Sequence, residues 1–288
     1  MKIPYYPGCT LNTVAKDFDT SAKVSAGALG LELKEMDQWN CCGAVFPLTP
    51  DNLMGLAAPA KVLNNAAKEG DVVTTLCSFC FNVLKRTKKA LEDQEKRDIV
   101  YDMLEEDCRD GVEVLHFIEL IKKRVGFDTL KTKVVKDLQG IKLAPYYGCM
   151  LLRPYEEAAI DDHESPHIFE DLLSSIGVEP IDFPGKINCC GAHLTVSEEE
   201  IVVKMSGRVL ISARKRGAEA VVTSCPLCLY NLDRGQKGAV KEDPAYKEIP
   251  VLYFTQVLGL ALGQEASVLG LDKNVYDPRP LLNEKGII

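Results

Sequence analysis

Asn40-Cys41-Cys42-Gly43-Ala44 occurs a second time in this chain, as Asn188-Cys189-Cys190-Gly191-Ala192. After each double cysteine, and at the same distance from it, comes a Cys-x-x-Cys pair, first Cys77 and Cys80, then Cys225 and Cys228. One further cysteine precedes each copy, Cys9 and then Cys149. Ten of the 11 cysteines thus form one pattern written twice, C-x31-CC-x34-C-x2-C and C-x39-CC-x34-C-x2-C. Recurrence in the same order indicates two copies of one structural unit.

The repeat extends beyond cysteine. Tyr5-Tyr6-Pro7-Gly8-Cys9 corresponds to Tyr146-Tyr147-Gly148-Cys149, and residues 72–77 correspond to 221–225. Val114-Leu115-His116-Phe117 likewise corresponds to Val251-Leu252-Tyr253-Phe254. We therefore expect a first domain over residues 1–130, a second over 141–265, a connection at 130–140 and an irregular C-terminal tail over 266–288. The tail is expected to be either a docking arm or disordered.

Each copy alternates short apolar runs with stretches of helical periodicity. Strands are predicted at residues 2–6, 31–34, 72–76 and 112–117, then at 143–147, 178–182, 220–223 and 251–254. Helices are predicted at residues 18–29, 53–68 and 79–91, then at 167–176, 197–216 and 254–262. This alternation predicts an α/β protein of two tandem repeats, each a largely parallel sheet with flanking helices.

The cysteines lie just after the predicted strands. Ligands of open α/β sheets bind outside the carboxyl ends of the strands, so we expect five thiolates to gather at this edge in each half. The glycine after each double cysteine allows the backbone to approach a bulky group. A zinc site or a cubic iron–sulfur cluster takes four thiolates. The fifth cysteine is therefore either spare or a ligand of an unusual centre.

Composition narrows the class of protein. The chain has 288 residues, 46% of them hydrophobic, with a formal net charge of −8. No basic patch dominates, which argues against nucleic-acid binding, and no apolar run reaches the roughly 20 residues of a membrane span. A candidate ligand already stands at Cys9, which leaves no room for a signal peptide, so we expect a cytoplasmic protein. A disulfide framework is typical of small secreted chains and does not fit.

The cysteine pattern and the Tyr-Tyr-Gly-Cys opening resemble the cysteine-rich CCG domain family, and within it the branch of the heterodisulfide reductase B subunits. The resemblance implies a non-cubane [4Fe–4S] cluster in each half. The first would be held by Cys9, Cys41, Cys42, Cys77 and Cys80, and the second by Cys149, Cys189, Cys190, Cys225 and Cys228. It also implies that two clusters facing each other reduce a disulfide, such as the mixed disulfide of coenzymes M and B, to two thiols. The implied partners are a ferredoxin-like iron–sulfur subunit of the C type and a flavoprotein subunit of the A type.

Two positions depart from the family pattern. The resemblance predicts a histidine after the cysteine that matches Cys149, as a proton donor, but Met150 stands there. A glycine-rich run after the second CCG is replaced by Ala192-His193-Leu194-Thr195. His193 is accordingly our candidate catalytic proton donor, with a histidine that only packs beside the cluster as the alternative.

The remaining candidates carry less weight. His163 and His167 lie in an acidic stretch and are expected to be solvated, and His116 is expected to be structural. Cys108, on a charged segment with helical character, has no counterpart in the second copy and is expected to be incidental. No flavin fingerprint or phosphate-binding loop is visible, so electrons must come from partner subunits. Two other functions stay open: an electron-transfer subunit without a disulfide substrate, and a scaffold stabilised by zinc in one or both halves.

Overall fold

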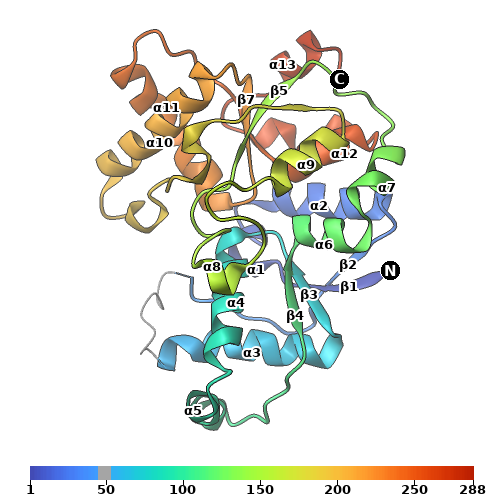
Figure 1. The fold of residues 1–288 in the computed structure, drawn as a ribbon, viewed down its shortest axis with the longest axis vertical. Helices are drawn as coiled ribbons and strands as arrows, with labels where there is room; N and C mark the ends of the chain where they lie inside the picture. The colour runs from blue at the N-terminus through green and yellow to red at the C-terminus, as the bar shows by residue number, and fades with distance from the viewer. Residues whose placement is uncertain (45–52) are drawn as a thin grey trace.

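The computed structural model describes residues 1–44 and 53–288, which form two four-stranded parallel sheets (Figure 1). The first sheet has the order β2-β1-β3-β4 and the second the order β6-β5-β7-β8. The strands of the first are β1 (Lys2–Tyr5), β2 (Glu32–Glu35), β3 (Val72–Thr75) and β4 (Glu113–His116). Those of the second are β5 (Lys142–Tyr146), β6 (Glu179–Pro180), β7 (Ala220–Thr223) and β8 (Val251–Tyr253). Because the topology is identical, the predicted α/β fold of two tandem repeats is confirmed.

The predicted helices are present with small shifts at their ends. In the first repeat they are α2 (Lys16–Ala28), α3 (Leu53–Glu69) and α4 (Ser78–Ala90). In the second they are α9 (Ile168–Ser175), α10 (Glu199–Lys215) and α12 (Phe254–Ala261). Helices that the sequence did not reveal are α1 (Gly8–Leu11), α5 (Gln94–Leu104), α6 (Phe117–Arg124), α7 (Phe127–Thr132), α8 (Tyr155–Ala158), α11 (Pro226–Glu242) and α13 (Arg279–Glu284).

The longest missed helix, α11, contains two glycines that weaken its helical signal. The structure explains them by the close packing of α11 against α10. A Cβ added at Gly235 would lie 2.5 Å from the Ser206 Cβ, and one added at Gly238 would lie 2.4 Å from the Val203 carbonyl oxygen. The glycines therefore serve tertiary packing, which overrides their low helix propensity.

Helices of both repeats share the layer between the two sheets, where α2 and α6 meet α9 and α12 (Figure 1). The Phe18 ring of α2 stacks on the Tyr253 ring at the end of β8, with centroids 4.0 Å apart. Ser21 Oγ lies 2.6 Å from Thr255 Oγ1. Buried apolar side chains of both halves form one continuous core. The edge of each sheet is thus held in a fixed position relative to the other.

The C-terminal tail is ordered, which corrects the expectation of an irregular docking arm or a disordered segment. Leu269 and Leu271 are buried, and α13 follows them. The Asn274 side-chain amide donates to the Val251 carbonyl oxygen at 2.6 Å, so the tail is attached to β8. Because the Gln256 amide also donates to Asn274 Oδ1 at 3.0 Å, the tail is joined to α12 as well.

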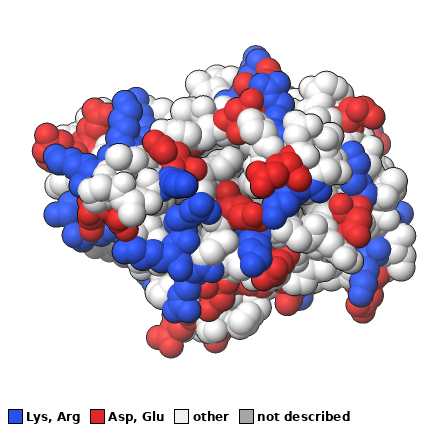
Figure 2. Space-filling model, turned by 90° about the horizontal axis from the view of Figure 1, so that it is seen from above, with Lys and Arg blue, Asp and Glu red and all other residues white. Residues whose placement is uncertain are grey.

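Lys and Arg alternate with Asp and Glu on the face seen in Figure 2, and neither sign covers it. Among the described residues, no helix is long and apolar enough to cross a membrane.

Candidate functional site

The cysteines lie at the carboxyl ends of the strands in both repeats. Cys9 and Cys149 follow β1 and β5, and Cys77 and Cys225 are the N-cap residues of α4 and α11. The second cysteine of each Cys-x-x-Cys pair, Cys80 or Cys228, lies in the first turn of the same helix. The double cysteines stand in loops after β2 and β6. The predicted gathering at one edge of each sheet therefore follows from the strand order.

The thiols are paired in the same way in both halves. In the first repeat, Cys9 and Cys41 have their Sγ atoms 3.6 Å apart, and Cys42 and Cys80 have theirs 3.5 Å apart. In the second repeat, the corresponding separations are 3.7 Å for Cys149 and Cys189 and 3.5 Å for Cys190 and Cys228. All of these cysteines are free thiols, as is Cys108.

A glycine in each repeat leaves room for the second Cys-x-x-Cys sulfur. A Cβ at Gly8 would lie 2.8 Å from Cys80 Sγ, and one at Gly148 would lie 3.3 Å from Cys228 Sγ. Both glycines have positive φ, at 71° and 65°. Larger residues would be strained here and would displace the sulfur, so backbone and thiol geometry are fitted to each other.

Hydrogen bonds between paired thiols separate their pKa values. The hydrogen bond from Cys41, followed by that from Cys80, lowers the pKa of Cys42 to about 4. The hydrogen bond from Cys149 lowers the pKa of Cys189 to about 5, although burial opposes it. Each half therefore carries thiolate at neutral pH, and thiolate is the form that ligates metals.

The two sites face each other across the boundary between the repeats. Ser78 Oγ lies 2.8 Å from Ser224 Oγ, and the Ser78 backbone N–H donates to the Ser224 carbonyl oxygen at 3.3 Å. Beside this contact, a hydrogen bond from the Cys225 thiol is the main cause that holds the pKa of Cys77 well below its usual range. The structure thus brings the Cys-x-x-Cys segments of the two halves into contact, which the sequence did not reveal.

Tyrosine hydroxyls fix the loops that carry the double cysteines. Tyr6 donates to the Asn40 carbonyl oxygen at 2.8 Å, and Tyr146 donates to the Asn188 carbonyl oxygen at 2.6 Å. Tyr6 therefore corresponds to Tyr146, and the pairs of tyrosines match with an offset of one residue.

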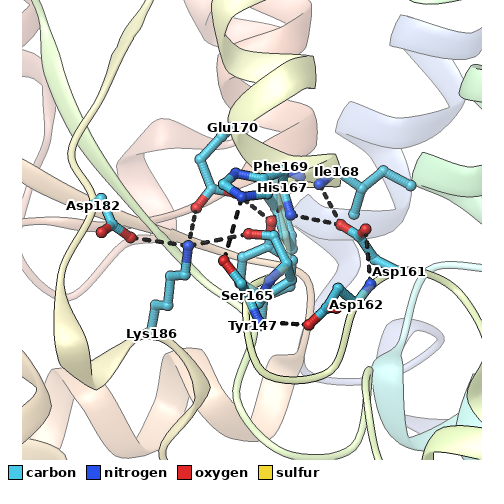
Figure 3. Close-up of polar contacts among 11 residues, drawn as sticks. Tyr147, Asp161, Asp162, Ser165, His167, Ile168, Phe169, Glu170, Asp182 and Lys186 are labelled. Atoms are coloured by element: carbon cyan, nitrogen blue, oxygen red, sulfur yellow. Dashed lines mark hydrogen bonds and ion pairs between the residues drawn. The ribbon is translucent and has the colours of Figure 1, made fainter.

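The second repeat adds a polar network around the buried Lys186, shown in Figure 3. The Lys186 ammonium contacts Glu170 at 2.7 Å and Asp182 at 2.9 Å, and the Tyr147 hydroxyl also donates to Glu170. The Lys186 carbonyl oxygen accepts from the backbone N–H groups of Tyr147 and Gly148. This network joins the segment before Cys189 to the turn before Cys149. A buried lysine with two carboxylates has no simple sequence signal, and it was missed.

His193 lies in a short 3-10 helix (Ala192–Leu194) directly after the second CCG. Its half-buried ring packs edge-on against Phe79, with centroids 5.3 Å apart, and Phe79 stands between the first-repeat cysteines Cys77 and Cys80. The candidate proton donor therefore lies where the two sites meet. Met150 is buried, and its carbonyl oxygen accepts from the Asn82 side-chain amide at 2.8 Å.

The other histidines and the eleventh cysteine do not join these thiol pairs, although His116 contacts Leu76, beside Cys77. His116 is fully buried at the end of β4, in line with its structural assignment. The His163 ring packs on Tyr155, and His167 precedes α9. Cys108 is exposed in the loop after α5 rather than on a helix, and its sulfur lies 3.5 Å from Asp110 Oδ1.

The paired thiols are spaced as ligands of metal atoms would be. Two thiolates about 2.3 Å from one tetrahedral metal lie roughly 3.8 Å apart, close to the separations of the four thiol pairs. Within residues 1–44 and 53–288, however, no three His, Cys, Asp or Glu side chains converge as ligands of a single ion. Paired cysteine thiolates are ligands that soft metals and iron–sulfur clusters take.

Comparisons with known proteins agree with the repeat. The model of the cysteine-rich domain family (CCG) matches residues 3–85 and 143–233. The chain is 35% identical, over 96% of its length and 98% of the relative's, to the 8-methylmenaquinol:fumarate reductase membrane anchor subunit of Wolinella succinogenes. It is 28% identical, over 95% of its length and 93% of the relative's, to the B subunit of the ferredoxin/F420H2-dependent CoB-CoM heterodisulfide reductase of Methanosarcina acetivorans.

One solved structure has the same fold. A hypothetical protein from Helicobacter pylori superposes with a TM-score of 0.76 and 13% sequence identity. The alignment covers 96% of this chain but only 52% of that protein, so this chain spans about half its length.

Proposed function

This chain belongs to the family of cysteine-rich CCG-domain proteins, and we propose that it is the iron–sulfur subunit of an oxidoreductase complex that reduces a disulfide. The observation that carries the proposal is the contact between the two cysteine sites through Ser78 and Ser224. Reducing one disulfide takes two electrons and two protons and releases two thiols. Two adjacent redox centres that each deliver one electron match this requirement.

In this proposal, the five cysteines of each half hold one non-cubane [4Fe–4S] cluster, and the clusters supply the electrons. The same thiol pairing in both halves supports two equivalent centres. Zinc is the alternative for either half.

The chain's own residues would position the substrate and supply a proton. The Ser78–Ser224 contact fixes the spacing of the two sites, and one sulfur of the disulfide would face each of them. His193, against Phe79 at this boundary, would donate a proton from its imidazole N–H to a departing sulfur. Met150, beside Cys149, has no proton to give.

A second function is favoured by one specific comparison. The relative at 35% identity is named a membrane anchor subunit of a fumarate reductase, whereas the heterodisulfide reductase subunit is 28% identical. The alternative is therefore an electron-transfer subunit that carries electrons between redox proteins and has no disulfide substrate. In both cases we propose partners of the ferredoxin-like and flavoprotein types and a cytoplasmic location.

Metal analysis and spectroscopy distinguish these functions. Anaerobically purified protein is expected to contain about eight iron atoms per chain, four per cluster, and to bleach in air. A colourless protein loaded with zinc would contradict both redox functions. A new paramagnetic signal when a small thiol is added to oxidised protein supports disulfide reduction, and no signal with intact iron supports the electron carrier.

A further inference from the structure

A cavity of about 680 Å³ opens between the repeats, beside residues that neighbour the cysteines in sequence. One wall comes from the first repeat, with Thr10 and Val14, and another from α11, with Pro226 and Tyr230. The ordered C-terminal tail adds Tyr276. Thr10 follows Cys9, with its hydroxyl 3.8 Å from Cys9 Sγ, and Pro226 follows Cys225. The cavity therefore adjoins both cysteine sites.

Asp233 is a buried acid in the wall of this cavity. It is only 5% exposed, and neither carboxyl oxygen has a hydrogen-bond partner among the described residues. Burial raises the pKa of Asp233 to about 7. Buried polar groups are nearly always hydrogen-bonded, so an unpartnered acid at a cavity wall points to a ligand. The matching position in the first repeat is Lys85, so the acid is found in the second repeat and is not common to both.

The cavity also presents a free cation one helical turn from the acid. Lys237 lies on the same face of α11 as Asp233, is exposed, and has no ion-pair or hydrogen-bond partner within the described part of the chain. The other two cations of the lining are engaged: Arg234 pairs with Glu199 at 3.0 Å, and Lys273 pairs with Asp272 at 3.0 Å.

The rest of the lining is mainly apolar or aromatic. It includes Val14, Pro226, Leu227, Leu229, Tyr230 and Tyr276. A cavity with one free cation, one buried acid and apolar walls suits a ligand with an anionic end and an aliphatic body.

We propose that this cavity binds a small aliphatic organic anion, with its carboxylate or similar group between the Lys237 ammonium and the Asp233 carboxyl. The aliphatic body would lie along the apolar wall toward Cys9 and Cys225. The binding of this ligand does not depend on the proposed disulfide reduction. Only the further step, that the bound ligand is the substrate, rests on that proposal.

Two probes of equal chain length test the site. They are 3,3′-dithiodipropionate, an anionic disulfide, and suberate, in which two methylenes replace the disulfide. Calorimetry on anaerobically purified protein is expected to give dissociation constants within about threefold of each other. Lys237→Met is expected to weaken both by about tenfold, since it removes a hydrogen bond to a charged group.

One control removes the same charge at a position outside the cavity, and another keeps the shape of the side chain. Lys241→Met removes the same charge further along α11, outside this cavity, and is expected to change binding by less than about twofold. Asp233→Asn keeps the shape and a hydrogen-bond donor and should retain binding, whereas Asp233→Leu should weaken it by about tenfold. No binding of either probe, or equal effects of Lys237→Met and Lys241→Met, would overturn the proposal.

The two proposals fail separately. If suberate binds with the expected dependence on Lys237 but dithiodipropionate is not reduced when electrons are supplied, the site stands and disulfide reduction fails. If dithiodipropionate is reduced at a rate that neither suberate nor Lys237→Met alters, the reduction stands and the site is wrong.

Discussion

In the second repeat, the Asn231 side-chain amide lies 3.6 Å from Cys190 Sγ, whereas the matching position in the first repeat is Val83, which has no donor. The outer thiols differ as well, since Cys9 and Cys41 are exposed while Cys149 and Cys189 are half-buried. The two repeats share the same cysteines and the same thiol pairing but differ in the residues that surround them. Hydrogen bonds and exposure of the sulfurs tune the potential of an iron–sulfur cluster. Two sites with equal ligands are therefore expected to have unequal potentials.

The largest expected effect comes from two single substitutions, each of which removes a proposed cluster ligand at the matching position of one half. Cys42→Ser and Cys190→Ser should each lower iron from about eight to about four atoms per chain and abolish disulfide reduction, because one sulfur would be left without a centre. Iron analysis and a reduction assay measure both effects. Cys108→Ser, which changes an exposed thiol outside the pattern, should leave iron and activity unchanged. Loss of iron in that control would show that the ligand set is wrongly assigned.

A smaller effect is expected at His193, which only the second repeat supplies. His193→Gln should slow turnover by about a hundredfold, as expected for loss of a general acid, and should leave iron content intact. Met150→His in the same variant should restore part of the rate, since it puts an imidazole beside Cys149. The matched control is His163→Gln, which changes a histidine packed on Tyr155. Wild-type rates for His193→Gln from pH 6 to 8 would exclude the assignment.

Exchanging Asn231 and Val83 sharpens the comparison of the two sites. Asn231→Val should lower the potential of the second site by about 60 mV, because a hydrogen bond to a charged group contributes roughly 1.5 kcal/mol and a tenfold change is 59 mV for one electron. Val83→Asn should raise the potential of the first site. A redox titration followed by EPR measures both shifts. Unchanged potentials with full iron content would show that this amide does not tune the site.

The sequence predicted the fold and the edge at which the thiols gather, because cysteine spacing and strand alternation are local signals. It did not predict α11, since the close approach of α10 at Gly235 and Gly238 is a tertiary contact. The Ser78–Ser224 contact was also missed, because it depends on how the repeats pack. The burial of Asp233 and of Lys186 was also missed by the sequence analysis. From sequence alone, a charged residue on a helix or in a loop is expected to be exposed to solvent, and only the tertiary structure shows that it is buried.

The smallest expected effect concerns His116 and Tyr253, which hold matching positions as N-cap residues after the last strand of each repeat. His116 is buried, its Nε2 donates to the Leu76 carbonyl oxygen at 2.8 Å, and its Nδ1 accepts from the Ile118 backbone N–H at 3.4 Å. Both ring nitrogens are thus used by the neutral form, and burial lowers the pKa of His116 to about 4.

An unfolded histidine has a pKa of about 6.5, so the unfolded chain binds this proton first as the pH falls. The free energy of unfolding is therefore unaffected by His116 above about pH 6.5 and decreases below it, until the folded pKa is reached near pH 4. Between pH 7.5 and 5.5 the expected loss is about 1 kcal/mol. His116→Asn, which keeps a capping side chain and cannot titrate, should remove this loss in urea denaturation under anaerobic conditions. The second repeat has no counterpart, because burial raises the pKa of Tyr253 well above this range. An unchanged slope in His116→Asn would mean that the first repeat is no more sensitive to acid than the second.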